Sequence, residues 1–499
     1  MKKIVVWALL FFSIFLRVPC QDSTIVYLRS VETSTLDPGK SNEKYSSEVI
    51  ANMFEGLVRF RKDSLDIEPC LAERWESLEN GQRWIFHLRR GVLFHDRTPF
   101  NARSVVYSFR ERMARQDSEY KKWNLLFSPV TAVRAVDDHT IEIALSRPYA
   151  PFLTYLMDVA AFIVPENAYE KKKFVPVGTG PFKFSSWEKD KNLVVSANPD
   201  YWGSRPQISK VVFTTVNDSA WRLLQIKNRN ADVVVVQSER EFEELLGRRE
   251  IQILTSHSLK TYFLAFNIRR PPFDRWEVRQ AFSHLLDKKI LVKQIFGQMA
   301  IPAVTLVPPQ LFGFNPHIKD PEFNIDTARQ LLQRAGLGRG FSCNLYFSEG
   351  SVALEEIVNR LTLNARRVLV TVKKVPLPFN KMRGLADRGE HDMLIIGWVG
   401  NPDPDFFLYP LLTMERGHSN RSFYDNPSLT ALLNQARENV DRGQREQLYF
   451  EAQEIIFKDA PCIPLFHLND MVAVSPDLKN LYTNPYNFLI FKDVSKKSF

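Results

Sequence analysis

VGTGPF, at residues 177–182, is the stretch of this 499-residue chain that first points to its fold. Its two glycines suit a tight turn, and we expect a positive φ at Gly178. The pattern looks superficially like a phosphate loop, but Pro181 removes a backbone N–H where an anion nest needs a donor. A predicted strand follows at residues 193–196, and NPDYW closes it at residues 198–202. We therefore interpret VGTGPF as a structural turn.

Strand and helix patterns alternate on both sides of this turn. Mixed elements throughout a chain predict an α/β protein. The pattern at residues 429–457 is too long for one ordinary helix, and we expect Gly443, with Asp441 and Arg442 before it, to break it into two. Strands are predicted at residues 25–28, 84–88, 140–145, 193–196, 211–215, 232–236, 262–266, 393–396 and 462–466, and helices at 46–53, 102–113, 278–295, 327–335, 354–366 and 429–457.

Motifs that carry enzyme chemistry are missing from the sequence. It contains no GxSxG, HExxH, GxxxxGKS, GxxxxGKT or GxGxxG pattern, and its nine histidines are scattered. We therefore expect no catalytic residue, no metal site and no cofactor. Distant residues can still form a catalytic site, so an exported enzyme or chaperone stays as the least favoured hypothesis.

The charge and the cysteine content argue against a nucleic-acid-binding protein and against a zinc-bound or disulfide-bonded scaffold. The net charge is +9, from 66 basic and 57 acidic residues, and only residues 171–173 form a block of like charge. A mild, scattered excess predicts no nucleic acid partner. Cys70, Cys343 and Cys462 show no CxxC spacing, so neither a zinc site nor a disulfide scaffold is indicated. At most one disulfide can form among them, and buried free thiols are an equal alternative.

The N-terminal residues predict export. Two lysines precede an apolar run at residues 4–16, which at about 1.5 Å per residue is too short to cross a bilayer but suits a signal peptide at residues 1–19. Cys20 directly after it suggests a lipoprotein cleavage site, where the thiol would be acylated. The alternative is that Cys20 is merely part of a soluble protein's signal. We expect the protein in the periplasm or at the outer face of the cytoplasmic membrane.

Short landmarks recur along nearly the whole mature chain. Each is weak alone and has a plain structural interpretation, as a glycine turn, as a large apolar anchor or, for PFNA at residues 99–102, as the start of the predicted helix. The set is STLDP 34–38, FEGL 54–57, PCLAERW 69–75, WIFHLR 84–89, GVLFHD 91–96, PFNA 99–102, VGTGPF 177–182, NPDYW 198–202, FN 266–267, PPF 271–273, RQAF 279–282, AG 335–336, GW 397–398 and APCIPL 460–465. Their order resembles the extracytoplasmic solute-binding proteins of peptide and nickel ABC importers, the oligopeptide- and dipeptide-binding family.

The resemblance implies a periplasmic-binding-protein-like fold with two lobes, an inserted subdomain and a hinge. Placed on this chain, lobe I comprises residues 20–55, 176–268 and 472–499, the inserted subdomain residues 56–175, and lobe II residues 269–471. Crossovers are expected near residues 266–272 and 472–484, where Pro271, Pro272 and Pro476 interrupt regular structure. A ligand in the cleft would contact both lobes and so favour the closed form.

The resemblance also implies a ligand site at the loop after GW. In peptide-binding members this loop pairs with an extended peptide through its backbone, and an Asp just beyond it holds the peptide's α-ammonium. Here Gly397, Trp398 and Val399 lead into the loop, and Asn401 stands about where that Asp is expected. A buried ammonium needs a counter-charge, and we expect Asp403 to supply it.

A second loop follows the LDP landmark and contributes Asn42 and Lys44. Lys44 could pair with a ligand carboxylate or remain a solvated surface charge. Arginines that some members place before the GW strand are replaced here, although Arg383 and Arg388 lie close by. A pocket without charged clamps would suit peptides of variable length, held mainly by main-chain pairing.

The favoured hypothesis is a non-catalytic, monomeric receptor that captures oligo- or dipeptides and delivers them to an ABC permease in the cytoplasmic membrane. A second hypothesis keeps the receptor but changes the ligand to a metal chelate, haem, a murein peptide or an opine-like compound. Closure on a ligand without turnover would support either receptor hypothesis.

Overall fold

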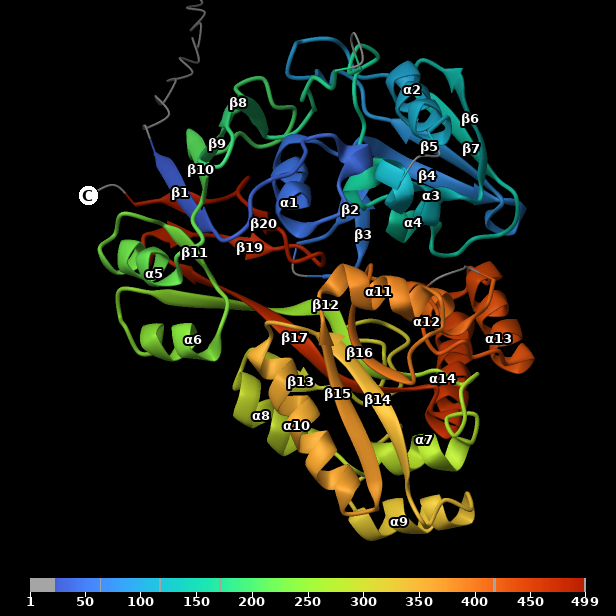
Figure 1. Ribbon diagram of the computed structural model, residues 1–499. Helices are drawn as coiled ribbons and strands as arrows, with labels where there is room; N and C mark the ends of the chain where they lie inside the picture. The colour runs from blue at the N-terminus through green and yellow to red at the C-terminus, as the bar shows by residue number, and fades with distance from the viewer. Residues whose placement is uncertain (1–22, 63, 116–117, 170–172, 416–418, 498–499) are drawn as a thin grey trace, which may run out of the picture.

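A computed structural model of the chain describes residues 23–62, 64–115, 118–169, 173–415 and 419–497. The predicted signal peptide and Cys20 lie outside the described residues. The mixed α/β fold is confirmed, with helices covering the sheets of two bodies (Figure 1).

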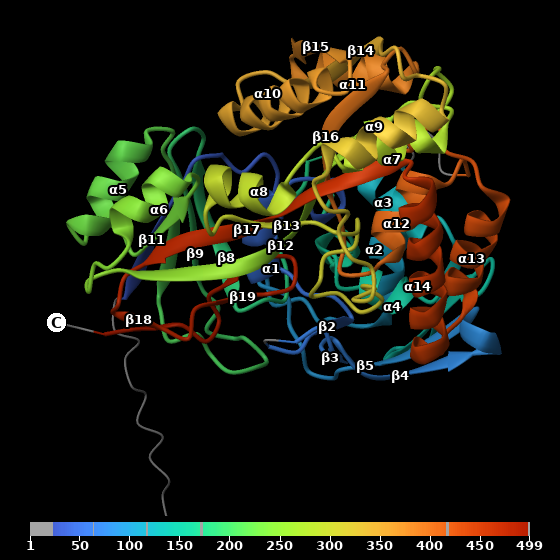
Figure 2. The same cartoon turned by 90° about the horizontal axis from the view of Figure 1, so that it is seen from below.

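One sheet of eleven strands runs through both bodies of the described chain, in the order β15-β14-β16-β12-β17-β11-β1-β10-β9-β8 with β13 on β17. Figure 2 shows its two long central strands, β12 and β17, side by side. The strands are β1 (Thr24–Arg29), β8 (Phe182–Glu188), β9 (Asn192–Ala197), β10 (Lys210–Thr215), β11 (Val233–Val236), β12 (Gln252–Phe266), β13 (Ala300–Pro302), β14 (Phe341–Ser348), β15 (Val370–Leu377), β16 (Met393–Val399) and β17 (Cys462–Val474).

Lobe I contains the N-terminal strand, the region after the inserted subdomain and the C-terminal tail. The amide of Asn52 donates to Leu489 and accepts from the N–H of Phe491, so the tail is tied to the first helix although it lies more than 400 residues away. The elements outside the main sheet are α1 (Lys44–Met53), α5 (Ser219–Lys227), α6 (Glu239–Leu245), β18 (Leu478–Lys479), β19 (Tyr482–Thr483), β20 (Leu489–Ile490) and β21 (Ser495–Lys496), with a 3-10 turn at Pro38–Lys40.

The VGTGPF turn packs against the end of α1. A β-carbon at Gly178 would lie 2.2 Å from the carbonyl oxygen of Met53, and the N–H of Gly180 donates to the same carbonyl. The positive φ that we expected at Gly178 is wrong, because its φ is not among the positive values of the described glycines. Glycine is required there for close backbone approach instead.

The inserted subdomain has its own four-stranded antiparallel sheet, in the order β4-β5-β7-β6, and its own buried core. Helix α2 begins at Asn101, whose side chain accepts from two backbone N–H groups, as the PFNA landmark suggested. The elements are β2 (Val58–Phe60), β3 (Ile67–Pro69), β4 (Ala72–Leu78), β5 (Arg83–Leu88), α2 (Ala102–Met113), α3 (Lys121–Phe127), β6 (Val130–Asp137), β7 (Thr140–Leu145) and α4 (Phe152–Tyr155), with 3-10 turns at Glu79–Gly81, Ser118–Tyr120 and Val159–Ala161.

Lobe II carries most of the helices. Two long patterns are each split in two: Asp287 caps α8, and Asp441 caps α14. The predicted break of the pattern at residues 429–457 is confirmed, because residues 439–441 separate two helices. Asp441 caps the second helix, and Gly443 lies inside its first turn. The helices are α7 (Trp276–Ser283), α8 (Lys288–Phe296), α9 (Ile325–Arg334), α10 (Val352–Arg366), α11 (Phe379–Asp387), α12 (Asp405–Leu412), α13 (Pro427–Glu438) and α14 (Arg442–Asp459).

The ladder between β12 and β17 breaks where the chain passes between lobes. Residues 252–257 pair with 469–474 of β17, which also pairs with β11 of lobe I. After a register shift, residues 261–265 pair with 462–467, and there β12 also pairs with β16 of lobe II. The change of partners lies at residues 258–260 of β12 and at residue 468 of β17. Each position is upstream of the crossover predicted for that part of the chain. A bulge made by ordinary residues interrupts the ladder, and no proline marks it.

Candidate functional site

A cavity of about 580 Å³ lies beside this break and is lined by segments of both lobes and the inserted subdomain. Its volume is within the range of about 300–1,000 Å³ that is typical of ligand sites. The lining residues are Asn42, Glu43, Lys44, Ser47, Ser118, Lys121, Lys122, Leu125, Ser258, Leu259, Lys260, Arg383, Trp398, Val399, Gly400, Asn401, Phe406, Asp470, Tyr486, Asn487 and Phe488. We refer to this cavity as the cleft.

Five of the predicted site residues line the cleft: Asn42, Lys44, Trp398, Val399 and Asn401. The structure therefore brings together the two loops that the resemblance pointed to, although more than 350 residues separate them in sequence.

Asp403 does not line the cleft, and its carboxylate is already occupied. It is fully buried, and its oxygens accept from Arg445 Nη1 at 2.9 Å and from Nη2 at 2.7 Å. Burial alone would lower the pKa of Arg445, but the Asp403 carboxylate raises it above its usual value. This geometry contradicts the ammonium-anchor role that we expected for Asp403, because a bidentate guanidinium already satisfies the charge.

Asp405 is also committed to an ion pair. Its Oδ1 lies 3.0 Å from Arg437 Nε, and its Oδ2 accepts from the hydroxyl of Tyr155 at 3.0 Å. Arg437 in turn stacks over Tyr149, and its carbonyl accepts from the N–H of Ala150. This cluster joins α12 and α13 of lobe II to the inserted subdomain.

Trp398 and Gly397 have different environments although they are adjacent. The indole of Trp398 donates to the carbonyl of Phe406 at 2.8 Å and leaves the ring as part of the cleft wall. Gly397 packs away from the cleft: a β-carbon there would lie 2.9 Å from the ring of Tyr262. Gly397 therefore permits close packing of β16 on β12, and its role is structural.

The end of β16 presents an edge with no strand partner among the described residues. The N–H of Gly400 donates to Leu259, and the N–H of Asn267 donates to Asp392. In an antiparallel ladder, every second residue of a strand hydrogen-bonds to a given neighbour. The backbone groups of the even-numbered residues of β16 therefore bond to β12, and those of Val399 point to the opposite side. On that other side β14 pairs only as far as Leu394. Val399 is 64% exposed and lines the cleft.

Sequence reasoning missed several residues of the cleft. Lys121 and Lys122 come from the inserted subdomain, Lys260 from the break in β12, and Tyr486 from the tail. No local motif marks them, because each reaches the cleft only through the packing of a distant element. Arg383 was considered on its sequence position alone, and the structure places it in the wall.

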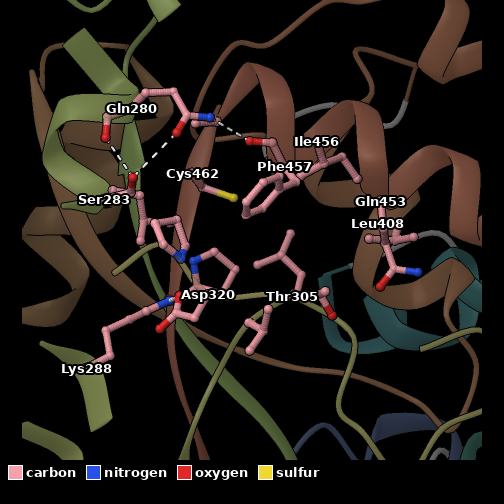
Figure 3. Close-up of a pocket in the computed structure, with 16 residues that line it drawn as sticks. Gln280, Ser283, Lys288, Thr305, Asp320, Leu408, Gln453, Ile456, Phe457 and Cys462 are labelled. Carbon is pink, nitrogen blue, oxygen red and sulfur yellow. Dashed lines mark hydrogen bonds and ion pairs between the residues drawn. The ribbon is translucent and has the colours of Figure 1, made fainter. Parts of the chain in front are cut away.

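A second, much smaller cavity of about 40 Å³ lies in lobe II between α7, α8 and α14 (Figure 3). Lys288 is buried there, pairs with Asp320, and donates to the carbonyls of Ala303 and Pro464 at 2.8 Å each. Since the cavity has room for only a few waters and the amine is satisfied, we assign it no ligand.

Metal-ligating side chains and thiols were also compared across the described residues. No group of three His, Cys, Asp or Glu side chains there is arranged to hold a metal ion. The three thiols at positions 70, 343 and 462 are free and buried, which resolves the disulfide alternatives, and burial raises the pKa of Cys343 and of Cys462 to about 12. Within the described chain, no helix has the length and apolar character to span a membrane.

A family model for bacterial extracellular solute-binding proteins, family 5 Middle, matches residues 66–419. The chain belongs to this family. Its members are solute-binding receptors of ABC importers, and their ligands include peptides, haem and metal chelates. The resemblance that we inferred from the ordered landmarks is confirmed.

Known relatives span nearly the whole chain. Heme-binding protein A of Haemophilus influenzae is 32% identical over 473 residues, covering 89% of this chain and 86% of that protein. The dipeptide-binding protein of Escherichia coli K12 is 29% identical and covers 95% of both. The solved structure of the periplasmic binding protein DppA of Helicobacter pylori, in complex with the peptide STSA, superposes with a TM-score of 0.79 at 29% identity, covering 94% of this chain and 98% of that one.

Proposed function

We propose that this protein captures peptides in the cleft and delivers them to the permease of an ABC importer. The observation that carries the proposal is the unpartnered edge of β16 at Val399, which lies in the wall of a cleft lined from both lobes. An extended peptide can add to such an edge through main-chain hydrogen bonds, which do not depend on peptide sequence. The dipeptide-binding relative and the peptide complex of the solved neighbour support the same ligand class.

Calorimetry with the mature chain and short peptides tests this role. Val399→Pro removes one backbone N–H on the cleft side and no bond to β12, so we expect peptide binding to weaken by about 0.5–1.5 kcal/mol with little loss of stability. Val399→Ala keeps the N–H and is the matched control. Equal affinity of the two variants would show that the edge does not hold the ligand, and a peptide that is cleaved during incubation would indicate an enzyme.

Haem is the alternative ligand, because the haem-binding relative is 32% identical to this chain. Haem iron takes His, Met, Cys or Tyr as axial ligands, and Tyr486 is the residue of these types that lines the cleft. Burial raises the pKa of the Tyr486 hydroxyl well above its usual value, which disfavours the phenolate form. Titration with haem, followed by absorbance in wild type and in Tyr486→Phe, separates this alternative from peptide binding.

We further propose that Cys20 becomes the lipid-modified N-terminus of the mature protein. A receptor of this kind must stay near its permease, and a lipid at Cys20 would supply the anchor. Cys20→Ser is expected to release the protein from membranes, as fractionation can measure. A variant that remains in the membrane fraction, or a mature N-terminus at another residue, would contradict this assignment.

A further inference from the structure

Positive charge dominates the wall of the cleft. Its lining includes five cationic side chains and two carboxylates. The cations are Lys44, Lys121, Lys122, Lys260 and Arg383, and the carboxylates are Glu43 and Asp470. A cleft walled by charges of one sign concentrates ligands of the opposite sign.

Both carboxylates of the wall are already used within the protein. Glu43 accepts from the backbone N–H groups of Tyr45 and Ser46 and so caps helix α1. Asp470 pairs with Lys44 at 3.0 Å and accepts from Asn487. Both carboxylates are therefore partly engaged within the protein, and the five cations outnumber them.

Three of the cations have no carboxylate close by, or share one with another arginine, and can therefore attract a ligand anion. Lys122 pairs with buried Asp158 at 2.8 Å, but Lys121 and Lys260 have no carboxylate within 4.0 Å in the described chain. Arg383 Nε lies 4.0 Å from Asp387, whose other oxygen already accepts from Arg421. Lys121 comes from the inserted subdomain, Lys260 from β12 beside Val399, and Arg383 from α11 of lobe II.

Asn401 is an independent observation that points to an acceptor ligand. It lines the cleft, its side chain is nearly fully buried at 3% exposure, and its Nδ2 has no hydrogen-bond partner in the described structure. A buried amide N–H without an acceptor is unfavourable by about 1–3 kcal/mol. The residue also stands about where peptide-binding relatives are expected to hold an ammonium, and it carries no negative charge.

We propose that the cleft selects anionic peptides, held by carboxylate groups placed between Lys121, Lys260 and Arg383 with Asn401 as a donor. The inference rests on the peptide-binding role proposed above and names the ligand class for it. Closing the lobes brings like charges toward one another, which is unfavourable without a ligand. A bound carboxylate reverses the sign of this interaction, so an anionic ligand favours the closed form more than a neutral one does.

Matched peptides test the charge preference on the mature chain. The tetrapeptide Ala-Glu-Glu-Ala is compared by calorimetry with Ala-Gln-Gln-Ala, and each with its C-terminal amide. We expect about a tenfold loss of affinity, which is about 1.4 kcal/mol, for the Gln peptide and a further loss for its amide. The preference should shrink between about 20 mM and about 300 mM salt, because the Debye length falls below the size of the cleft.

Two variants decide the outcome. Arg383→Gln should reduce the Glu-over-Gln preference about threefold to tenfold, whereas Lys381→Gln, on the same helix α11 but outside the wall, should leave it unchanged. If both peptides bind equally in wild type, the charge inference is overturned and the peptide-binding role stands. If no peptide binds at any charge, the peptide-binding role itself fails. Lys121→Gln repeats the test from the inserted subdomain, so a folding defect in one variant cannot mask the result.

Discussion

Charged side chains are paired in the loop that follows β16 but have no carboxylate partner at two lysines of the cleft wall. Asp403 and Asp405 lie at the far end of the loop, and each is buried against an arginine. In the wall, Lys121 and Lys260 face the cleft without a carboxylate partner in the described structure. The charged residues of the loop and of the wall thus have two different roles. Paired charges in the dry interior hold the loop in place, and unpaired charges at the wet surface remain for a ligand.

Breaking the buried pair of Asp403 and Arg445 is expected to give the largest effect. Arg445→Met leaves Asp403 uncompensated and should lower the free energy of unfolding of lobe II by about 3–5 kcal/mol, measured by urea denaturation. The double variant with Asp403→Leu should recover most of that loss, because an apolar pair replaces a buried ion pair. Arg442→Met, at the exposed start of the same helix, is the control.

The ligand affinity of Asp403→Asn tests whether Asp403 takes part in ligand binding in addition to its buried ion pair. Folded protein of this variant should bind peptides with a free N-terminus and N-acetylated peptides in the same ratio as wild type. A selective loss for the free amines would restore Asp403 as the ammonium anchor.

Tyr155→Phe loosens the contact between the inserted subdomain and lobe II. It removes one hydrogen bond to the charged carboxylate of Asp405, which is worth about 1.5–3 kcal/mol, and so shifts the lobes toward the open form. Small-angle scattering should then show a larger radius of gyration without ligand, and affinity should fall. Tyr169→Phe removes a similar bond to Asp37 that does not involve lobe II. Equal scattering profiles for the two variants would refute a closing role for Tyr155.

Asn401→Asp adds a carboxylate to the cleft wall and should partly cancel the excess of positive charge there. We expect affinity for the Ala-Glu-Glu-Ala peptide to fall about tenfold, which is about 1.4 kcal/mol, because the new charge repels the ligand. Peptides with a free N-terminus should gain relative to N-acetylated ones. Asn401→Ala removes the amide without adding charge and separates the two effects. A rise in affinity for the acidic peptide in Asn401→Asp would contradict the proposed role.

An effect of about the same size is expected at His95, which holds the VGTGPF turn. Its Nδ1 accepts from the N–H of Gly178, and its Nε2 donates to the carbonyl of Gly180, so the neutral ring fits. Burial lowers the pKa of His95 to about 4. Since the unfolded side chain titrates near 6.5, the stabilisation is complete above that pH and is lost as pH falls toward 4.

The pH dependence of His95→Gln measures this contribution. Between about pH 7.5 and 5.5, unfolding free energy should fall about 1.4 kcal/mol less in the variant than in wild type. Between about pH 8.5 and 7.5 the two should change in parallel, which serves as the internal control. Equal slopes below pH 6.5 would show that His95 takes up a proton in the folded state.

Features set by residues close in sequence were predicted well. Asn101 caps α2 where the PFNA landmark suggested, and α2 covers the same residues as the predicted helix at 102–113. The break at residues 441–443 was predicted too, and Asp441 caps the helix that follows it. The single helix predicted at residues 278–295 is wrong, because the side chain of Asp287 caps a second helix within it.

By itself the sequence determined the family, the α/β class and the two loops that carry Asn42, Lys44, Trp398 and Asn401, because ordered motifs and periodicity are local properties. Only the tertiary structure decided which charges are free. Asp403 meets Arg445 across 42 positions of the chain, and Tyr155 meets Asp405 across 250. The place where β12 changes its strand partners between the lobes was also decided there, since a bulge between two long strands has no proline to mark it. The physical reason is that pairing and burial set the function of a charge, and both are created when distant segments pack together.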